Sequence, residues 1–212
     1  MPLLPPIPDL EFHPDAHRYR YQGDWLPWST TQIVSDLTPE AKAHIERTKD
    51  GPNGWAIRGT TIHGWLESHL LGEAEASHGD FSAWIEALRG CWLWKDCEVL
   101  AVEYRLCDPL KRVAGSFDFL LRTGKGTVVL GDLKSVGSAP AAKSRKTADA
   151  QLGSYVHMLA VHHPNITVER CVTVVSGPGV CEVKSSEVDA CCEAWVNAWE
   201  RFSDEQDLLY GF

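Results

Sequence analysis

The segment 115–134 constrains the fold more than any other part of the sequence, because it has the pattern of a β-hairpin. Apolar, β-prone residues fill 119–121 and 127–130, and the tetrad Thr-Gly-Lys-Gly at 123–126 separates them. A glycine-containing loop of this length between two such runs is typical of antiparallel strands. The sequence therefore predicts a central hairpin whose register the turn determines.

Three charged residues lie on this predicted hairpin. Folding the chain at its turn sets Asp118 opposite Gly131 or Asp132. Because strand side chains repeat every two residues, Asp132 and Lys134 share a face and converge with Asp118. Like charges that face each other across strands are destabilising, so the acidic pair indicates a raised carboxyl pKa or a bound cation. The hairpin therefore predicts a metal site in outline.

Length and composition predict a single domain. At 212 residues, with 44% hydrophobic content and nine Trp, the chain can bury a substantial core as one domain over 1–212. Its start has prolines and no basic segment, and no apolar run approaches the ~18 residues of a membrane span. We therefore expect a soluble, cytoplasmic protein without a membrane partner.

The cysteines indicate neither disulfides nor a zinc ribbon. There are seven of them, an odd number, and no two have Cys-x-x-Cys spacing. We expect buried free thiols, including Cys191 and Cys192 in a late helix.

Hydrophobic periodicity and turn residues predict strands and helices in a mixed order. A hairpin is expected over 12–28 and helices over 29–37, 39–47, 60–71 and 81–96, so a helical segment up to about residue 98 precedes the central hairpin. Strands are expected over 97–106, 168–176 and 180–184, and helices over about 147–162 and from Ser186 onward. This order predicts the α/β class, with a central mixed β-sheet flanked by helices.

The charge distribution favours a nucleic-acid partner in spite of the net charge. A net charge of −9 counts against phosphate binding, which needs a cationic footprint. Between residues 104 and 146, however, nine Lys or Arg stand against three Asp. Lys143, Arg145 and Lys146 are the candidates for DNA binding, and a solvated loop is the alternative. Candidates for stacking on unpaired bases, each with core packing as the alternative, are Trp25, Trp28, Trp55 and Trp65.

Two further clusters lie on predicted helices that flank the hairpin. His63 lies on the border of an apolar helix face, where it fits a hydrogen-bonded structural residue as well as a ligand. Gln151 and Tyr155 lie one turn apart in a later helix for which Thr147 or Asp149 is the expected cap. Tyr155 also fits the apolar stripe of that helix, and Gln151 fits a surface position.

These clusters form an ordered string of motifs. It comprises Gly-x-x-x-His, an early-strand Glu, Gly-x-x-Asp, Asp-x-Lys and Gln-x-x-x-Tyr, with the residues His63, Glu103, Asp118, Asp132, Lys134, Gln151 and Tyr155. The string resembles the PD-(D/E)XK nuclease superfamily, above all its RecB-like and Cas4-like exonuclease branch of phage and bacterial type. The resemblance implies a restriction-endonuclease-like fold. Phe117 stands where the superfamily name has Pro, and without Cys-x-x-Cys spacing we expect no iron–sulfur cluster.

The resemblance also implies a set of metal ligands. Asp118, Asp132, the backbone carbonyl of Leu133 and His63 would bind Mg²⁺ or Mn²⁺. Hard cations of this kind prefer carboxylate and carbonyl oxygens, and Mn²⁺ accepts an imidazole more readily than Mg²⁺ does.

Catalytic roles follow from the same resemblance. Lys134 would orient the attacking water or help to deprotonate it, and would offset charge in the transition state. Gln151 and Tyr155 would position the DNA strand or support Lys134. Glu103 matches the early-strand Glu of the branch, and a solvated strand residue is the alternative.

The function implied by the resemblance is that of a Mg²⁺- or Mn²⁺-dependent deoxyribonuclease. An exonuclease that hydrolyses phosphodiester bonds at DNA ends in recombination, repair or phage DNA metabolism is the main expectation. DNA is the expected partner, and a recombination or single-strand-binding protein and an oligomeric state are further expectations. One alternative is a catalytically silent DNA-binding or scaffold protein on the same fold. Another is a nucleotide hydrolase, because 137–144 nearly spells a P-loop, although Ala142 stands where that loop needs Gly.

Overall fold

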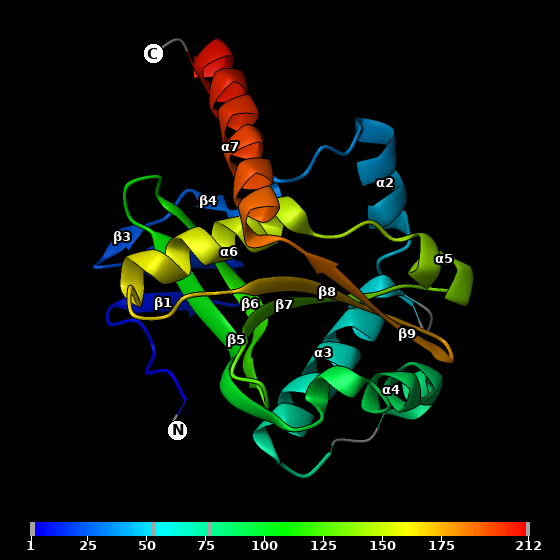
Figure 1. Cartoon of the computed structure of the whole chain (residues 1–212). Coiled ribbons are helices and arrows are strands. Elements are labelled where there is room, and N and C mark those ends of the chain that lie inside the picture. Colours follow the sequence, from blue (N-terminus) through cyan, green and yellow to red (C-terminus); the bar gives the residue numbers. More distant parts are fainter. Residues whose placement is uncertain (1–2, 52–53, 76–77, 211–212) are drawn as a thin grey trace.

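The computed structural model describes residues 3–51, 54–75 and 78–210. Within this part of the chain, six strands form a mixed sheet in the order β4-β6-β7-β8-β9, with β5 also paired to β6 (Figure 1). The strands are β4 (Trp28–Ser29), β5 (Cys97–Asp108), β6 (Val113–Thr123), β7 (Val128–Ser135), β8 (Arg170–Gly177) and β9 (Val180–Ser186). The pairs β4–β6 and β7–β8 are parallel, and β5–β6, β6–β7 and β8–β9 are antiparallel.

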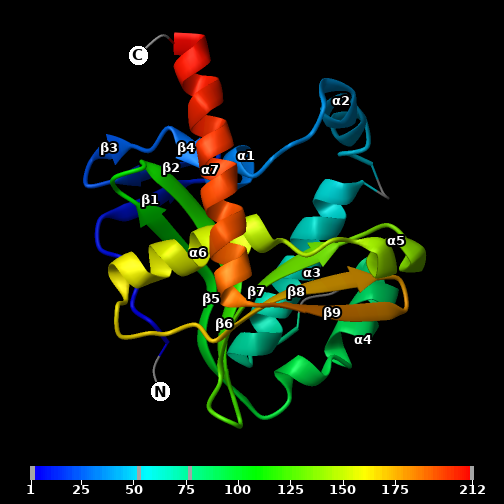
Figure 2. The same ribbon diagram turned by 45° about the horizontal axis from the view of Figure 1, so that its top comes forward.

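Helices cover both faces of this sheet (Figure 2). One face carries α3 (Trp55–Leu71) and α4 (Ser82–Arg89), and the other carries α6 (Asp149–His162), against which α7 (Val188–Tyr210) packs. The shorter helices are α1 (Thr30–Ile33), α2 (Pro39–Arg47) and α5 (Ala139–Ser144), with 3-10 turns at Gly79–Phe81 and Trp92–Trp94. The predicted α/β class, a central mixed sheet flanked by helices, is confirmed. None of the helices in the described ranges combines the length and apolar content that crossing a membrane requires.

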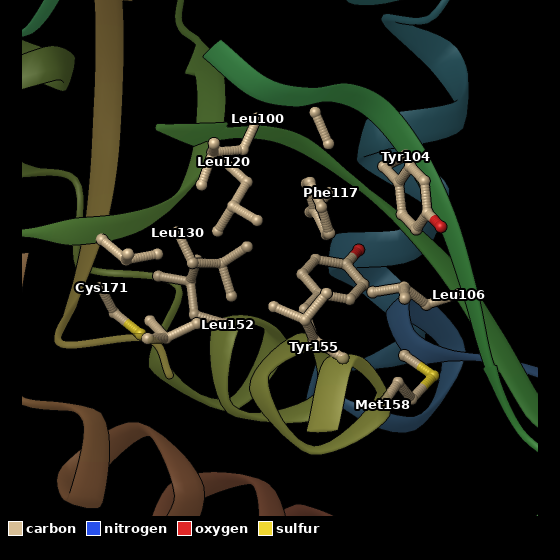
Figure 3. Packing of buried hydrophobic residues seen from close by; sticks show 14 of the residues in the cluster. Leu100, Tyr104, Leu106, Phe117, Leu120, Leu130, Leu152, Tyr155, Met158 and Cys171 are labelled. Atoms are coloured by element: carbon tan, nitrogen blue, oxygen red, sulfur yellow. The ribbon is translucent and has the colours of Figure 1, made fainter. Parts of the chain in front are cut away.

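Two hydrophobic clusters hold the layers together. The cluster on the α6 side includes Leu152, Tyr155 and Met158 of α6 with Leu106, Phe117, Leu120 and Leu130 of the strands (Figure 3). The cluster on the other side includes Ile62, Trp65, Ile85 and Leu88 of α3 and α4 with Phe119, Leu121 and Val174. Each buried side chain of this size contributes about 1.5–3 kcal/mol. Strands β6 and β7 are therefore held firmly from both faces.

The central hairpin has the predicted register. Phe119 pairs with Gly131, so the next step along the two strands sets Asp118 across from Asp132. Gly131 is required here, because a Cβ on it would lie 1.9 Å from Cζ of the Phe119 ring. The hairpin thus places both aspartates directly after the apolar residues that pair across its two strands.

The N-terminal region differs from its prediction. β1 (Leu10–His13), β2 (Arg18–Tyr21) and β3 (Asp24–Trp25) form a three-stranded antiparallel sheet, here called the meander. Trp28 then leaves this sheet and pairs in parallel with Val113 of β6. The hairpin expected over 12–28 is present between β2 and β3, with its turn at residues 22–23. The prediction missed the additional turn between β1 and β2 and the pairing of Trp28 with a distant strand, for which local sequence carries no signal.

Helix predictions are confirmed where a cap marks the end. α2 has the predicted bounds, with Thr38 as N-cap and Pro39 in the first turn. α3 ends as predicted at Gly72, which adopts the left-handed conformation with φ of 69°. It begins earlier than expected, at Trp55.

Two predicted helices are shorter than expected. The helix expected over 29–37 ends at Ile33, since Thr38 must be extended before Pro39. The helix expected over 81–96 ends at Arg89, because Gly90 is a weak helix former and Cys91 is extended. In both segments the apolar spacing continued past the residues that stop the helix.

The late helices also correct the predicted caps. The N-cap of α6 is Ala148, so neither Thr147 nor Asp149 caps it. Ser186 ends β9 and donates its hydroxyl to Asp149 Oδ1 at 2.6 Å, while α7 begins at Val188. The sequence analysis missed α5, although Ser138 is its N-cap and Pro140 lies in its first turn.

The seven cysteines are free thiols. Cys91, Cys107, Cys171 and Cys191 are buried, as expected, whereas Cys192 is half-buried.

Candidate metal centre

A cleft of about 510 Å³ is bounded by α3, α6, strands β5 to β7 and the meander. Every residue of the motif string lines it, namely His63, Glu103, Asp118, Asp132, Lys134, Gln151 and Tyr155. Leu133 lines it as well. The fold therefore brings into one cavity residues that come from five separate elements.

Three of these side chains form a group that can hold a metal ion. The candidate ligand atoms of His63, Glu103 and Asp118 all lie within 4.8 Å of one another. His63 Nδ1 is 2.9 Å from Asp118 Oδ1 and 3.5 Å from Glu103 Oε1. The strands explain this proximity, since β5 and β6 pair on either side of the two carboxylates and set them across from each other. The helix α3 supplies the imidazole from above the sheet.

The backbone at Glu103 is strained. Its φ is 45°, in the left-handed region that residues other than Gly, Asn and Asp rarely adopt, at a cost of about 1–3 kcal/mol. The pairing of β5 with β6 continues on both sides of this residue. Strain of this kind gathers at functional sites, where the surrounding structure maintains it.

A second group of side chains lies beside the first, and hydrogen bonds connect its members. Gln151 Nε2 donates to Asp132 Oδ1 at 2.8 Å and to the Tyr155 hydroxyl at 2.9 Å. Lys134 Nζ donates to Gln151 Oε1 at 2.9 Å and lies 2.9 Å from Asp132 Oδ2. Gln151 is only 9% exposed, so the surface position considered for it is wrong. This network holds the Lys134 ammonium group in one place.

Gly115 of the Gly-x-x-Asp motif makes room for this network. A Cβ at Gly115 would lie 2.8 Å from Thr30 Oγ1 and 2.8 Å from Cε1 of Tyr155. Any larger residue would therefore push Tyr155 away from β6. The motif needs glycine here because the aromatic ring approaches the strand backbone closely.

Burial and mutual repulsion shift the pKa values of the carboxyl groups. Burial, against the effect of neighbouring cations, raises the pKa values of both Glu103 and Asp132. Burial would also raise the pKa of Asp118, but His63 and the Leu133 amide hold it below its ordinary value. Burial would lower the pKa of His63, yet the nearby Asp118 and Glu103 raise it to about 10. The cleft thus gathers three carboxyl groups whose burial and mutual repulsion a bound cation would relieve.

These residues fit a hard divalent cation. Asp132 Oδ2 is buried and, apart from its contact with Lys134, has no hydrogen bond of good geometry. Carboxylate oxygens with one imidazole are a suitable donor set for Mg²⁺ or Mn²⁺. The three-residue group contains Glu103 beside the expected His63 and Asp118. Metal ligation by His63 and Asp118, as by Asp132 and the Leu133 carbonyl, stays a prediction.

The predicted DNA-binding residues lie outside the cleft. Lys143, Arg145 and Lys146 are exposed around the end of α5, and Lys184 Nζ donates to the backbone carbonyls of the first two. Their contact with DNA stays a prediction. In the segment that nearly spells a P-loop, the chain forms α5 and Ala142 is fully buried.

The structure separates the four tryptophans that sequence analysis could not distinguish. Trp65 is buried in the core, Trp28 is half-buried, and Trp25 is exposed but does not line the cleft. Trp55 is 39% exposed and does line it. A helical signal was available, because Trp55, Gly59 and His63 follow each other at four-residue spacing and so share one face of α3.

The sequence analysis missed several other residues of the cleft, namely Phe12, His17 and Tyr19 of the meander, Arg105 of β5 and Ser116 of β6. Arg105 follows the strand residue Glu103 by two positions, which is the spacing of side chains on one face. That signal would have identified it. The meander residues had none, because their place beside the cleft depends on tertiary contacts.

No protein-family model matches this chain, and no curated protein matches it either. Among solved structures, the protein SSO0001 is 16% identical with a TM-score of 0.46, covering 84% of this chain and 75% of its own. An alkaline exonuclease from Laribacter hongkongensis is 11% identical with a TM-score of 0.43, covering 85% of this chain and 87% of its own. The argument for a function therefore depends on the residues of the cleft.

Proposed function

We propose that this protein is a divalent-metal-dependent nuclease that hydrolyses phosphodiester bonds in DNA. The observation that carries the proposal is the position of His63, Glu103 and Asp118 within 4.8 Å of one another, in the same cleft as Lys134. The resemblance of the motif string to the PD-(D/E)XK nucleases supports it.

His63, Glu103 and Asp118 would hold the metal ion, with Asp132 beside them. A bound Mg²⁺ or Mn²⁺ supplies Lewis-acid polarisation of the scissile phosphate and a lowered pKa for the attacking water. The protein contributes a cavity in which the carboxylates are mutually repelled until a cation is present.

Lys134 has the position of a group that acts on the attacking water. An ammonium group has three donors; Gln151 Oε1 accepts from one of them, and the nitrogen also forms an ion pair with Asp132 Oδ2 at 2.9 Å. The remaining donor is available to the cleft, where it can orient a water and offset negative charge on the phosphate. The side chain is 25% exposed, so substrate can reach it.

Gln151 and Tyr155 are positioning residues in this proposal. Gln151 contacts Lys134 with its carbonyl oxygen, and Asp132 and Tyr155 with its amide group. Burial raises the pKa of Tyr155 well above its ordinary value of 10, so its hydroxyl stays protonated. Together they set the position of Lys134 without touching the scissile bond.

We further propose that the enzyme is an exonuclease acting at DNA ends, in recombination, repair or phage DNA metabolism. This finer assignment follows the RecB-like branch of the resemblance. A recombination or single-strand-binding protein is the kind of partner that such an activity would have.

The test is digestion of end-labelled linear duplex, single-stranded and closed circular DNA with Mg²⁺, Mn²⁺ or EDTA. Wild type is compared with Asp118→Ala and Lys134→Ala, and Lys125→Ala serves as a matched control, since this exposed lysine lies in the hairpin turn outside the cleft. We expect metal-dependent loss of linear DNA that both cleft variants abolish and the control retains.

The other outcomes are equally informative. Cutting of circles would make the enzyme an endonuclease at the same site. DNA binding without cleavage under any condition would contradict the nuclease and leave a silent DNA-binding protein.

A further inference from the structure

We infer that the cleft accepts an unpaired nucleic-acid strand, with Trp55 stacking on a base and Arg105 binding a neighbouring phosphate. This inference rests on the proposed function and names the form of the substrate. It assigns roles to two residues that lie outside the motif string.

The dimensions of the cleft favour a single strand. Its volume of about 510 Å³ lies within the roughly 300–1,000 Å³ of pockets that enclose one small ligand, which corresponds to one or two nucleotides. Asp118 is only 7% exposed and Asp132 only 2%, so the carboxylates lie at the bottom of the cleft. The meander lines one side and α3 another. A narrow cleft with the carboxylates at its bottom favours a strand that is separated from its complement.

Trp55 presents a fixed aromatic surface to this space. Its indole N–H donates to the backbone carbonyl of Ile45 at 2.7 Å, which restrains the ring, while 39% of the residue is exposed. Gly59 follows one turn later on the same helix face, and even an added Cβ would meet only Ser135 Oγ, at 4.0 Å. Gly59 has no side chain, so on this line of the α3 face no side chain lies between the Trp55 indole and His63. A ring held in this way is pre-organised for stacking, which tolerates any base.

Arg105 supplies a cation one strand step away from the carboxylates. Its guanidinium lies 5.1 Å from the centre of the Phe12 ring and, within 3–51, 54–75 and 78–210, forms no ion pair with a carboxylate. Two residues along a strand span about 7 Å, so Arg105 follows Glu103 by a step similar to the spacing of successive phosphates. Ser116 is its partner in the register, and Ser116 Oγ is buried without a hydrogen-bond partner. The guanidinium and this hydroxyl offer unused donors to a phosphate.

Other exposed tryptophans do not share this setting. Trp25 is 40% exposed and Trp92 63% exposed, yet neither lines the cleft. Trp92 lies instead beside the hairpin turn, in a separate hollow with Lys125 and Thr127. Trp92 is therefore a suitable control for a general effect of losing an exposed tryptophan.

The first experiment compares two single-stranded oligonucleotides that differ only in bases. One is normal and the other has abasic sites in its terminal nucleotides, and kcat/KM is measured for wild type, Trp55→Ala, Trp55→Phe and Trp92→Ala. We expect wild type to prefer the normal oligonucleotide by about tenfold. Trp55→Ala should remove the preference, while Trp55→Phe and Trp92→Ala should keep it.

The preference, and not the absolute rate, decides the role of Trp55. If Trp55→Ala slows both oligonucleotides equally, the residue only supports α2 and the inference is wrong. It is equally wrong if wild type shows no preference for bases.

The second experiment tests Arg105 with a neutral linkage. A methylphosphonate next to the scissile phosphate should slow wild type by about tenfold, because it removes the charge that Arg105 binds. Arg105→Gln should be slow on both substrates and insensitive to the replacement. An equal penalty in wild type and variant would overturn this role.

Binding separates a failure of this inference from a failure of the proposed function. Fluorescence anisotropy of the same oligonucleotides is measured with Asp118→Ala, alone and combined with Trp55→Ala. Base-dependent binding that needs Trp55, without any cleavage by wild type, would support the inference and contradict the nuclease. Cleavage without base dependence would support the nuclease and contradict the inference.

Discussion

Two buried aspartates in neighbouring strands have opposite surroundings. Asp108, at the end of β5, is 3% exposed, and Asp118 in β6 is 7% exposed. Asp108 Oδ1 accepts the backbone amides of Leu110 and Lys111, and its Oδ2 lies 3.4 Å from Lys111 Nζ and 3.0 Å from His157 Nε2. These two amides and the lysine and histidine side chains satisfy the hydrogen-bonding capacity of the Asp108 carboxylate.

Asp118 also has a histidine and an amide as partners, but it shares its cavity with Glu103 and Asp132. Asp118 therefore lies among two further carboxyl groups, whereas the partners of Asp108 are backbone amides, a lysine and a histidine. Burial of a carboxylate is therefore not itself the mark of a functional site. A cluster of carboxylates facing a cavity is a better mark, because a bound cation would relieve their mutual repulsion.

The largest predicted contrast between the two positions is in activity. Asp118→Asn should lower kcat/KM for DNA on the order of a thousandfold or more, because it removes a group that contacts the metal and the reacting phosphate. Asp108→Asn should leave activity unchanged when assayed below its Tm. Comparable losses in both variants would mean that Asp118 acts only through the fold.

Metal-induced stabilisation should differ in the same direction. At a Mn²⁺ concentration about 100 times Kd, binding contributes about 2.7 kcal/mol to the unfolding free energy, or roughly 5–10 °C in Tm for a chain of this size. Thermal denaturation should show this rise in wild type and in Asp108→Asn but not in Asp118→Asn, and EDTA should reverse it. The same rise in all three proteins would place the bound ion elsewhere.

In the absence of metal, we expect the substitution at Asp108 to destabilise the protein more than the substitution at Asp118. Asp108→Asn should lower the unfolding free energy by about 2 kcal/mol, since it weakens charge-assisted hydrogen bonds to buried partners. Asp118→Asn should lower it by less, because relief of repulsion from Glu103 and Asp132 partly offsets the weakened contacts with His63 and the Leu133 amide. Urea denaturation in EDTA measures both values, and a greater loss at Asp118 would contradict the comparison.

The smallest predicted effect is a pH dependence at Asp108. Burial would raise its pKa, but the Lys111 amide and ammonium, with His157, hold the pKa below the ordinary value of 3.8. A depressed carboxyl pKa gives stability that is present above the unfolded value and lost as pH falls through the folded value. The difference between wild type and Asp108→Asn should therefore be constant from about pH 5 to 7 and shrink below 3.8. A difference that grows in acid would show that the sign is wrong.

The sequence predicted what local patterns control. The hairpin turn at 123–126 determined that Asp118 meets the region of Asp132, and the structure has that register. Caps and stop signals gave α2 and the end of α3. In each case a few neighbouring residues carry the whole preference.

Non-local contacts were beyond such reasoning. The pairing of Trp28 with Val113 and the approach of His63 to Glu103 join segments far apart in the chain. Hydrophobic periodicity does not reveal such contacts, because each residue would give the same local pattern whichever distant residue it contacted. The motif string placed these residues in one site only through resemblance. The motif string contains no meander residue, so the meander side of the cleft was missed.

The helix α2 has a consequence for how this protein can vary. None of its nine residues is buried, and it stands apart from the sheet in Figures 1 and 2. Substitutions at such positions usually change stability by no more than about 0.5 kcal/mol. Its Ile45 carbonyl nevertheless holds the Trp55 indole at the cleft. Because a backbone carbonyl makes this contact, the side chains of α2 can change residue by residue at almost no cost to folding, while the hydrogen bond that restrains Trp55 is kept.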